Sequence, residues 1–311
     1  MHNLLNAATL FGIIGMAIKL AMPYLYAGLG ELFDQAAGVF NLGTEGIMLI
    51  GAFSSFYVVY LTGNSGLGIL AAILSGFLMA LLMAVISITF KAPQGISGIG
   101  LTMFGTGLSS LLFKTILEGT VLSIDGFPNL PLPLLSKIPW IGPILFDQNI
   151  LTYGIYILLP ISAFILYRTS WGLTIRSTGE NPEAVDVAGI SVNRVRFLMV
   201  LLSGVMGGIA GSFYSIGYLG MFADNIIGGR GWIAFAICFL GNWNPKGALV
   251  GTIVFGLAEA LAIYMQSLGG QSFFPNELFI ALPYLLTIAL TITRRSFNVP
   301  AKLGEPYIKE N

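Results

Sequence analysis

Residues 197–218 read FLMVLLSGVMGGIAGSFYSIGY, a stretch without a single charged side chain. A bilayer core about 30 Å thick is crossed by roughly 20 apolar residues in a helix, so this stretch is long enough to span it. Small residues recur in it every four positions and form two adjacent rows, which are Ser203, Gly207 and Gly211, and Gly204, Gly208 and Ser212. Such faces let membrane helices approach closely, and the stretch is predicted to pack tightly against another helix.

The composition extends this interpretation to the whole chain. Its 311 residues are 56% hydrophobic and only 9% charged. A soluble domain carries about 25% charged residues because its surface faces water, so lipid is predicted to be the main solvent of this protein. The formal net charge is zero, which gives no indication of a nucleic acid partner.

We therefore predict an all-α fold, a polytopic transmembrane helical bundle that forms one domain over residues 1–311. About nine spans are expected, at residues 10–29, 46–61, 67–90, 99–117, 150–167, 197–218, 231–240, 248–267 and 278–293. The seventh is too short for a full crossing, which predicts a broken or partial span.

Basic residues set the expected orientation, because Lys and Arg concentrate in cytoplasmic loops. They gather in the loop 168–196 and in the tail 294–311, so both are predicted to be cytoplasmic. The N-terminus and the proline-rich loop 118–149 then lie outside. That loop is expected to be an irregular cap, either a docking surface for an external partner or a plain connector. Spans one to four and six to nine would enter from opposite sides, the layout of an inverted repeat.

Catalytic chemistry is not indicated. The chain has no G-x-x-x-x-G-K-[ST] loop to hold ATP phosphates. Its one histidine is His2 and its one cysteine is Cys238, so neither a His/Cys metal site nor an internal disulfide is expected. We predict no catalytic residues, no metal and no cofactor.

The loop 168–196 contains a short helix with signals at both ends. Asn181 is a good N-cap and Pro182 suits the first helical position. Glu183 places negative charge near the positive end of the helix dipole, and Gly189 can end the helix in the left-handed conformation. The alternative is a surface helix that only joins two spans.

Three blocks of sequence carry a family resemblance. The text GENPEAVDVAGISVNRVRF at 179–197 resembles the EAA-type coupling loop of ABC importer permeases for simple sugars, branched-chain amino acids and nucleosides. Similar blocks are GELFDQAAGVFNLGTEGIMLIGAF at 30–53 and GYLGMFADNIIGGRGWIAFAICFLGNWNPKGALVGTIVFG at 217–256. The chain looks most like the nucleoside-type permease that works beside a second, paralogous permease. It departs from the motif at Val185, where the name has alanine.

The resemblance implies a plasma membrane transport subunit with three kinds of protein partner. Two permeases would form the pathway, two cytoplasmic ATPase domains would hydrolyse ATP, and an external binding protein would deliver the solute. The residues expected to couple transport to the ATPase are Glu180, Asn181, Pro182, Glu183, Ala184 and Gly189. Simple sugars and branched-chain amino acids remain alternative solutes. A secondary transporter or channel is the alternative class, although it has no need of a capped cytoplasmic helix.

Polar residues inside the predicted spans are candidates for the translocation pathway, because charge in hydrocarbon usually faces a cavity or a partner. They are Asn41, Glu45, Asn225 and Glu259. Glu259 could instead hydrogen-bond a neighbouring helix, and for Glu45 helix capping is favoured over solute contact. The glycine-rich segments 38–46 and 225–231 are expected to be counterparts near the pathway. Lys114 and Glu118 are predicted to pair at i,i+4.

Overall fold

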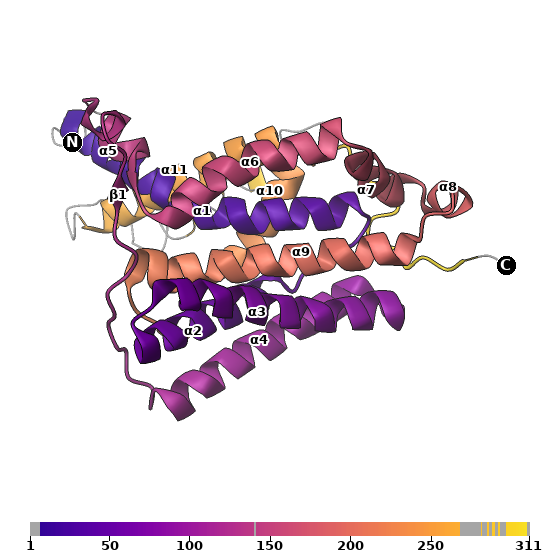
Figure 1. Ribbon diagram of the computed structural model, residues 1–311, viewed down its shortest axis with the longest axis horizontal. Helices are drawn as coiled ribbons and strands as arrows, with labels where there is room; N and C mark the ends of the chain where they lie inside the picture. Colours follow the sequence, from indigo (N-terminus) through magenta and orange to yellow (C-terminus); the bar gives the residue numbers. More distant parts are fainter. Residues whose placement is uncertain are drawn as a thin grey trace.

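The computed structural model describes residues 7–139, 141–267 and 297–309, together with residues 281, 285, 288, 289 and 292. Long helices run side by side along one axis, with α5 at one end and α7 and α8 at the other (Figure 1). The long helices are α1 (Ala7–Ala36), α2 (Thr44–Thr62), α3 (Ser65–Ala84), α4 (Gln94–Ile116), α6 (Ile150–Arg168), α9 (Val192–Ser212) and α11 (Pro245–Ser267). The π-helical turns η2 (Val85–Thr89) and η4 (Phe213–Leu219) extend α3 and α9.

Within the described residues, seven helices are long and apolar enough to cross a membrane. Each coincides with a predicted span. The predicted seventh span is α10 (Arg230–Gly241), whose 12 residues reach only about 18 Å along the helix axis. It is therefore too short to cross the bilayer core alone, as its length indicated. The predicted span 278–293 lies almost wholly outside the described residues, so the total of nine stays a prediction.

The first predicted span ends too early. The prediction ends it at residue 29, whereas α1 continues to Ala36 and buries Glu31, Asp34 and Gln35 completely. For Glu31, polar partners make this possible. The Glu31 carboxylate accepts hydrogen bonds from the Thr44 hydroxyl and, at 3.2 Å, from Gln35 Nε2. Hydrogen bonding of this kind offsets the cost of burying a polar group.

Helix α9 lies at the centre of the bundle, and its small residues face helices of this same chain. Gly208 packs against the Ala72 carbonyl of α3, and Gly211 packs against the Met48 carbonyl of α2. On α1, Gly30 lies against Ser203. A Cβ atom at Gly208 would overlap the Ala72 carbonyl oxygen, so the close approach of these backbones depends on glycine.

The loop 118–149 forms a small cap beside the start of α1. It holds the strands β1 (Leu130–Pro131) and β2 (Asp147–Gln148), the 3₁₀ turn η3 (Leu135–Lys137) and the short helix α5 (Ile141–Leu145). The strands pair antiparallel, with Leu130 opposite Gln148 and Pro131 opposite Asp147. This two-stranded ribbon is a minor departure from the all-α prediction.

The predicted ion pair between Lys114 and Glu118 does not form. Helix α4 ends at Ile116, and Glu118 has a left-handed φ of 52°, so it no longer follows the helical spacing. Lys114 Nζ instead lies 3.9 Å from Asp224 Oδ2 in the loop before α10, and both side chains are largely exposed.

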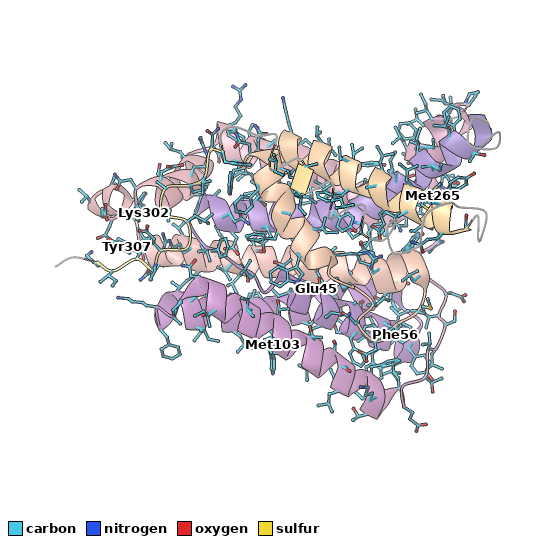
Figure 2. All side chains as sticks on the ribbon, turned by 180° about the vertical axis from the view of Figure 1, so that it is seen from behind. Glu45, Phe56, Met103, Met265, Lys302 and Tyr307 are labelled. Atoms are coloured by element: carbon cyan, nitrogen blue, oxygen red, sulfur yellow. The ribbon has the colours of Figure 1, made fainter. Side chains whose placement is uncertain are left out.

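Large apolar side chains cover the outer surface of the bundle. Met103 projects from the outer face of α4, whereas Glu45 lies inside the bundle near α10 (Figure 2). On α4, Ile96 is 72% exposed and Met103 is 70% exposed. Soluble proteins rarely expose a contiguous apolar patch along a whole helix. These helices therefore face lipid.

Candidate translocation site and coupling surface

At one end of the bundle, α7 (Ser170–Glu180) and α8 (Pro182–Val187) protrude from the transmembrane helices (Figure 1). The Asn181 side chain caps α8 by accepting a hydrogen bond of 3.0 Å from the Ala184 N–H, and Pro182 occupies the first helical position. At the other end Gly189 adopts a left-handed φ of 81°, and the Ile190 N–H donates to the Val185 carbonyl at 3.2 Å. The predicted start of the helix at Asn181 and Pro182 and its predicted end at Gly189 are both confirmed.

The outer face of α8 is free for contact. Glu183 and Ala184 are exposed and Val187 is 89% exposed, while Pro182 and Val185 are buried beneath them. Val185 thus points inward, and its difference from the alanine of the motif leaves the exposed face unchanged.

The chain's C-terminal segment lies against this surface. Glu180 Oε2 accepts a hydrogen bond of 3.3 Å from the Ala301 N–H, and Asp186 Oδ2 pairs with Lys309 Nζ at 3.0 Å. Lys302 and Tyr307 lie at the same end of the molecule (Figure 2). Desolvation and the Asp186 carboxylate both raise the pKa of the Tyr307 hydroxyl.

Inside the bundle, the two predicted glycine-rich segments meet through Glu45. This residue lies in the first turn of α2, and its carboxylate accepts backbone hydrogen bonds from Gly229 at 2.8 Å and Gly231 at 2.6 Å. Those N–H groups begin α10. Helix N-termini carry partial positive charge, so one carboxylate compensates the N-terminal ends of both α2 and α10. Glu45 thus caps α10 deep in the protein, whereas the prediction had it capping its own helix at the membrane interface.

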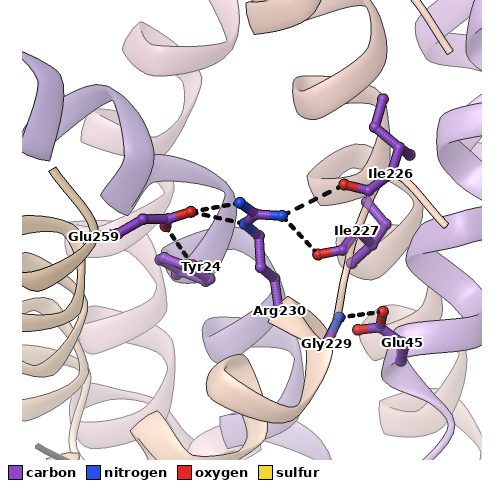
Figure 3. Close-up of polar contacts among 7 residues, drawn as sticks. All are labelled: Tyr24, Glu45, Ile226, Ile227, Gly229, Arg230 and Glu259. Atoms are coloured by element: carbon purple, nitrogen blue, oxygen red, sulfur yellow. Dashed lines mark hydrogen bonds and ion pairs between the residues drawn. The ribbon is translucent and has the colours of Figure 1, made fainter. Parts of the chain in front are cut away.

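At the first residue of α10, Arg230 is held by Glu259 of α11. Glu259 Oε1 accepts hydrogen bonds from Arg230 Nε at 2.9 Å and Nη2 at 2.6 Å, and the Tyr24 hydroxyl donates to Oε2 at 2.5 Å (Figure 3). Arg230 Nη1 also donates to the Ile227 carbonyl at 2.9 Å. The guanidinium lies 5.2 Å from the centre of the Tyr214 ring, within the range of a cation–π contact.

The structure thus brings together two of the four predicted pathway residues. Glu45 and Glu259 flank residues 229–231, whereas Asn41 is buried elsewhere and accepts a hydrogen bond of 2.8 Å from the Gly43 N–H. Asn225 is exposed in the loop before α10 with a φ of 55°. Among the described residues, no group of three or more His, Cys, Asp or Glu side chains is placed to hold a metal ion.

Sequence reasoning missed the role of Arg230 and of the two tyrosines. Arg230 was visible as a cation beside a glycine pair in an apolar region, but its partner is 29 residues away on another helix. Tyr24 lies in the middle of an apolar span, where nothing in the sequence distinguishes it from an ordinary core aromatic residue.

Residues 13–291 match the family model described as the permease component of branched-chain amino acid transport systems. The chain belongs to this permease family. It is therefore a multi-pass permease subunit in the cell membrane, and membership of the family removes the alternative of a secondary transporter or channel.

The permease is similar over nearly its whole length to named ABC transporter permeases. The guanosine permease NupQ of Bacillus subtilis is 36% identical over 96% of both chains, and the nucleoside permease NupC of Lactococcus lactis is 35% identical over 99% of both. TsgC13 of Haloferax volcanii, provisionally named a glucose ABC transporter permease, is 35% identical over 96% of this chain and 98% of its own.

Two more distant likenesses are informative. NupP, a second guanosine ABC transporter permease of Bacillus subtilis, is 24% identical over 94% of this chain and 84% of its own length. An ABC transporter provisionally assigned to the metal-chelate type, solved in an inward-facing conformation, superposes with a TM-score of 0.52 at 17% identity, covering 91% of this permease and 85% of that chain. The structural likeness concerns the fold alone.

Proposed function

We propose that this permease is the membrane subunit of an ATP-driven importer for nucleosides, with its N-terminus outside and its C-terminus in the cytoplasm. It would work beside a paralogous permease, a cytoplasmic ATPase and an external solute-binding protein. The observation that carries the proposal is α8, a helix with capping signals at both ends and an exposed outer face. Such a face is suited to contact with a partner protein. The pair NupQ and NupP in one organism supports a paralogous second permease.

The proposed orientation is supported by the arrangement of the basic segments. The tail 297–309 contacts the loop that holds α7 and α8, so the two segments with the most Lys and Arg lie at the same end of the bundle. The start of α1 lies at the opposite end beside α5, where Gly15 contacts Ile144 (Figure 1). Positive residues favour the cytoplasmic side, which puts α8 within reach of an ATPase.

The charged residues around the start of α10 favour a neutral polar solute. The Glu45 carboxylate already accepts hydrogen bonds from the N–H groups of Gly229 and Gly231, and Arg230 already forms an ion pair with Glu259. A zwitterionic amino acid needs uncommitted donors for its carboxylate, of the kind that free helix N-termini supply in transporters. A nucleoside or a sugar presents hydroxyl and ring nitrogen atoms and needs no counter-charge. We retain Asn41, Glu45, Asn225 and Glu259 as pathway residues within this proposal.

The test is uptake by the complex purified with its partners and reconstituted into liposomes. Guanosine is expected to enter in an ATP-dependent manner, while leucine does not. Uptake of glucose without guanosine would establish the sugar alternative suggested by TsgC13. Uptake of leucine would refute the argument from charge.

The coupling role of α8 is tested by Glu183→Lys, which inverts an exposed charge on its outer face. We expect the permease to fold and insert while ATP-dependent uptake is lost. Glu118→Lys is the matched control, since Glu118 is also exposed and lies at the opposite end of the bundle. Normal uptake by the Glu183 variant would exclude this face from the ATPase contact.

A further inference from the structure

Residues 297–309, here called the C-terminal strap, run across the end of the bundle and bind several elements in turn. The Asn298 N–H donates to Asn242 Oδ1 beyond α10 at 2.8 Å. The Lys302 N–H donates to the Gly179 carbonyl of α7 at 2.9 Å, and the Gly304 N–H donates to the Gly38 carbonyl beyond α1 at 3.1 Å. A terminal segment with this many backbone hydrogen bonds to other elements is part of the fold.

Arg196, in the first turns of α9, holds the strap through a hydrogen bond. It is 1% exposed, which is rare for arginine. Its Nη1 donates to the Glu305 carbonyl of the strap at 2.6 Å, and its Nε donates to the Ala37 carbonyl after α1 at 3.2 Å. One rigid guanidinium fork therefore joins three segments that are distant in sequence, a task that a lysine ammonium does not reproduce.

The crossing point of these segments is Gly38. Its φ is 85°, and a Cβ atom there would lie 2.8 Å from Arg196 Nη2, 3.2 Å from Gly179 Cα and 3.2 Å from the Lys302 carbonyl oxygen. The ends of α1 and α7, the start of α9 and the strap thus meet at one residue without room for a side chain.

The strap also contacts the end of α7 and the last turn of α8. Before the helix, Glu180 accepts the Ala301 N–H, and in its last turn Asp186 pairs with Lys309 at 3.0 Å. Helix α8 itself has six residues and buries only Pro182 and Val185. A helix this short is not stable alone and takes its position from tertiary contacts.

We propose that the C-terminal strap fixes α8 to the ends of α1, α7, α9 and α10, so that the coupling helix and the transmembrane helices move as one body, with Arg196 as the positioning residue. The inference rests on the proposed function, in which α8 receives the movement of the ATPase. Apart from the strap, α8 is joined to α7 through Asn181 and is anchored by the buried Pro182 and Val185. The strap adds a second connection to the transmembrane helices.

The test compares Arg196→Lys with Arg194→Lys in the reconstituted complex, measuring solute uptake and ATP hydrolysis together. Arg194 is exposed on the same helix and serves as the control. For Arg196→Lys the uptake per ATP hydrolysed is expected to fall by about fivefold or more, the low end of ordinary coupling between sites. Arg194→Lys is expected to leave the ratio unchanged. An unchanged ratio in the Arg196 variant overturns the proposal.

A second measurement does not depend on transport. Hydrogen exchange of the amides in α8 is expected to quicken in Arg196→Lys and in the charge-reversed variant Lys309→Asp. The swapped variant Asp186→Lys with Lys309→Asp should restore slow exchange. Unchanged exchange in all variants refutes the proposed role of the strap in fixing α8. Failure of the proposed function is separate, because it appears in the unsubstituted complex as uptake that does not need ATP.

Discussion

Glu259 holds Arg230 through two hydrogen bonds, of 2.9 and 2.6 Å, that converge on a single carboxylate oxygen. The other carboxylate oxygen is bound by Tyr24 of α1. The pair therefore fastens the start of the short helix α10 to α11 and α1. Loss of the Arg230–Glu259 ion pair is predicted to lower stability more than it weakens solute binding.

The first prediction concerns Glu259→Gln. This change leaves the Arg230 guanidinium without its counter-charge, a loss that in buried pairs costs about 3–5 kcal/mol. Because the Arg230 side chain is 29% exposed, we expect a value toward the low end, seen as a lower midpoint of thermal unfolding in detergent. The control is the double variant Arg230→Met with Glu259→Met, which should lose less than the single one. A single variant as stable as the parent would contradict the pairing.

The second prediction concerns Glu45→Gln. The amide retains one acceptor oxygen, but its NH₂ group faces the N–H groups that begin α10, so one cap is lost. N-cap losses cost about 0.5–2 kcal/mol, and a correspondingly lower unfolding midpoint is expected. Glu118→Gln, in an exposed loop position, should leave the midpoint unchanged. Equal effects of the two substitutions would show that Glu45 has no capping role.

The third prediction tests the packing of α9. Gly208→Ala places a Cβ atom against the Ala72 carbonyl of α3, and overpacking of this kind costs about 1–3 kcal/mol. Gly107→Ala, in the middle of α4, adds the same atom where nothing lies within 4 Å. Folded yield and thermal midpoint should fall for the first variant alone. If both behave alike, the close contact between α3 and α9 is not needed for stability.

The fourth prediction concerns the cap of α8. Asn181→Ala removes the side chain that accepts the Ala184 N–H, which destabilises a helix by about 1 kcal/mol. The amides of α8 should then exchange about fivefold faster, while the transmembrane helices keep their protection. Asn193→Ala, at an exposed position early in α9, provides the comparison. Faster exchange throughout the protein would mean that the substitution acts globally.

Much of the fold could be predicted because the bilayer imposes it. Predominantly apolar runs of about 20 residues cross lipid as helices, so seven spans and the short α10 follow from hydropathy. The ends of α8 were also predictable, because Asn181, Pro182 and Gly189 act on backbone groups within a few residues of themselves. Local chemistry is visible in a local stretch of sequence.

The parts that were not predicted depend on contacts between distant residues. The end of α1 was misplaced because Glu31 is stabilised by Thr44, which belongs to the next helix. Lys114 was paired with its neighbour in sequence, whereas its partner Asp224 is more than a hundred residues away. Arg196 was treated as one of several loop cations, although it is buried. Each of these outcomes is fixed by tertiary packing, which single-sequence patterns do not contain.

The contact between Glu45 and Gly229 joins residues separated by 184 positions, and this separation bears on how the permease is made. At synthesis rates of about 5–20 residues per second, roughly 10–40 s pass between the emergence of the carboxylate and that of the amide that binds it. During that interval Glu45 belongs to a membrane-inserted chain that lacks its partner. The N-terminal half therefore cannot complete its own assembly until α10 has been made and has reached Glu45 of α2.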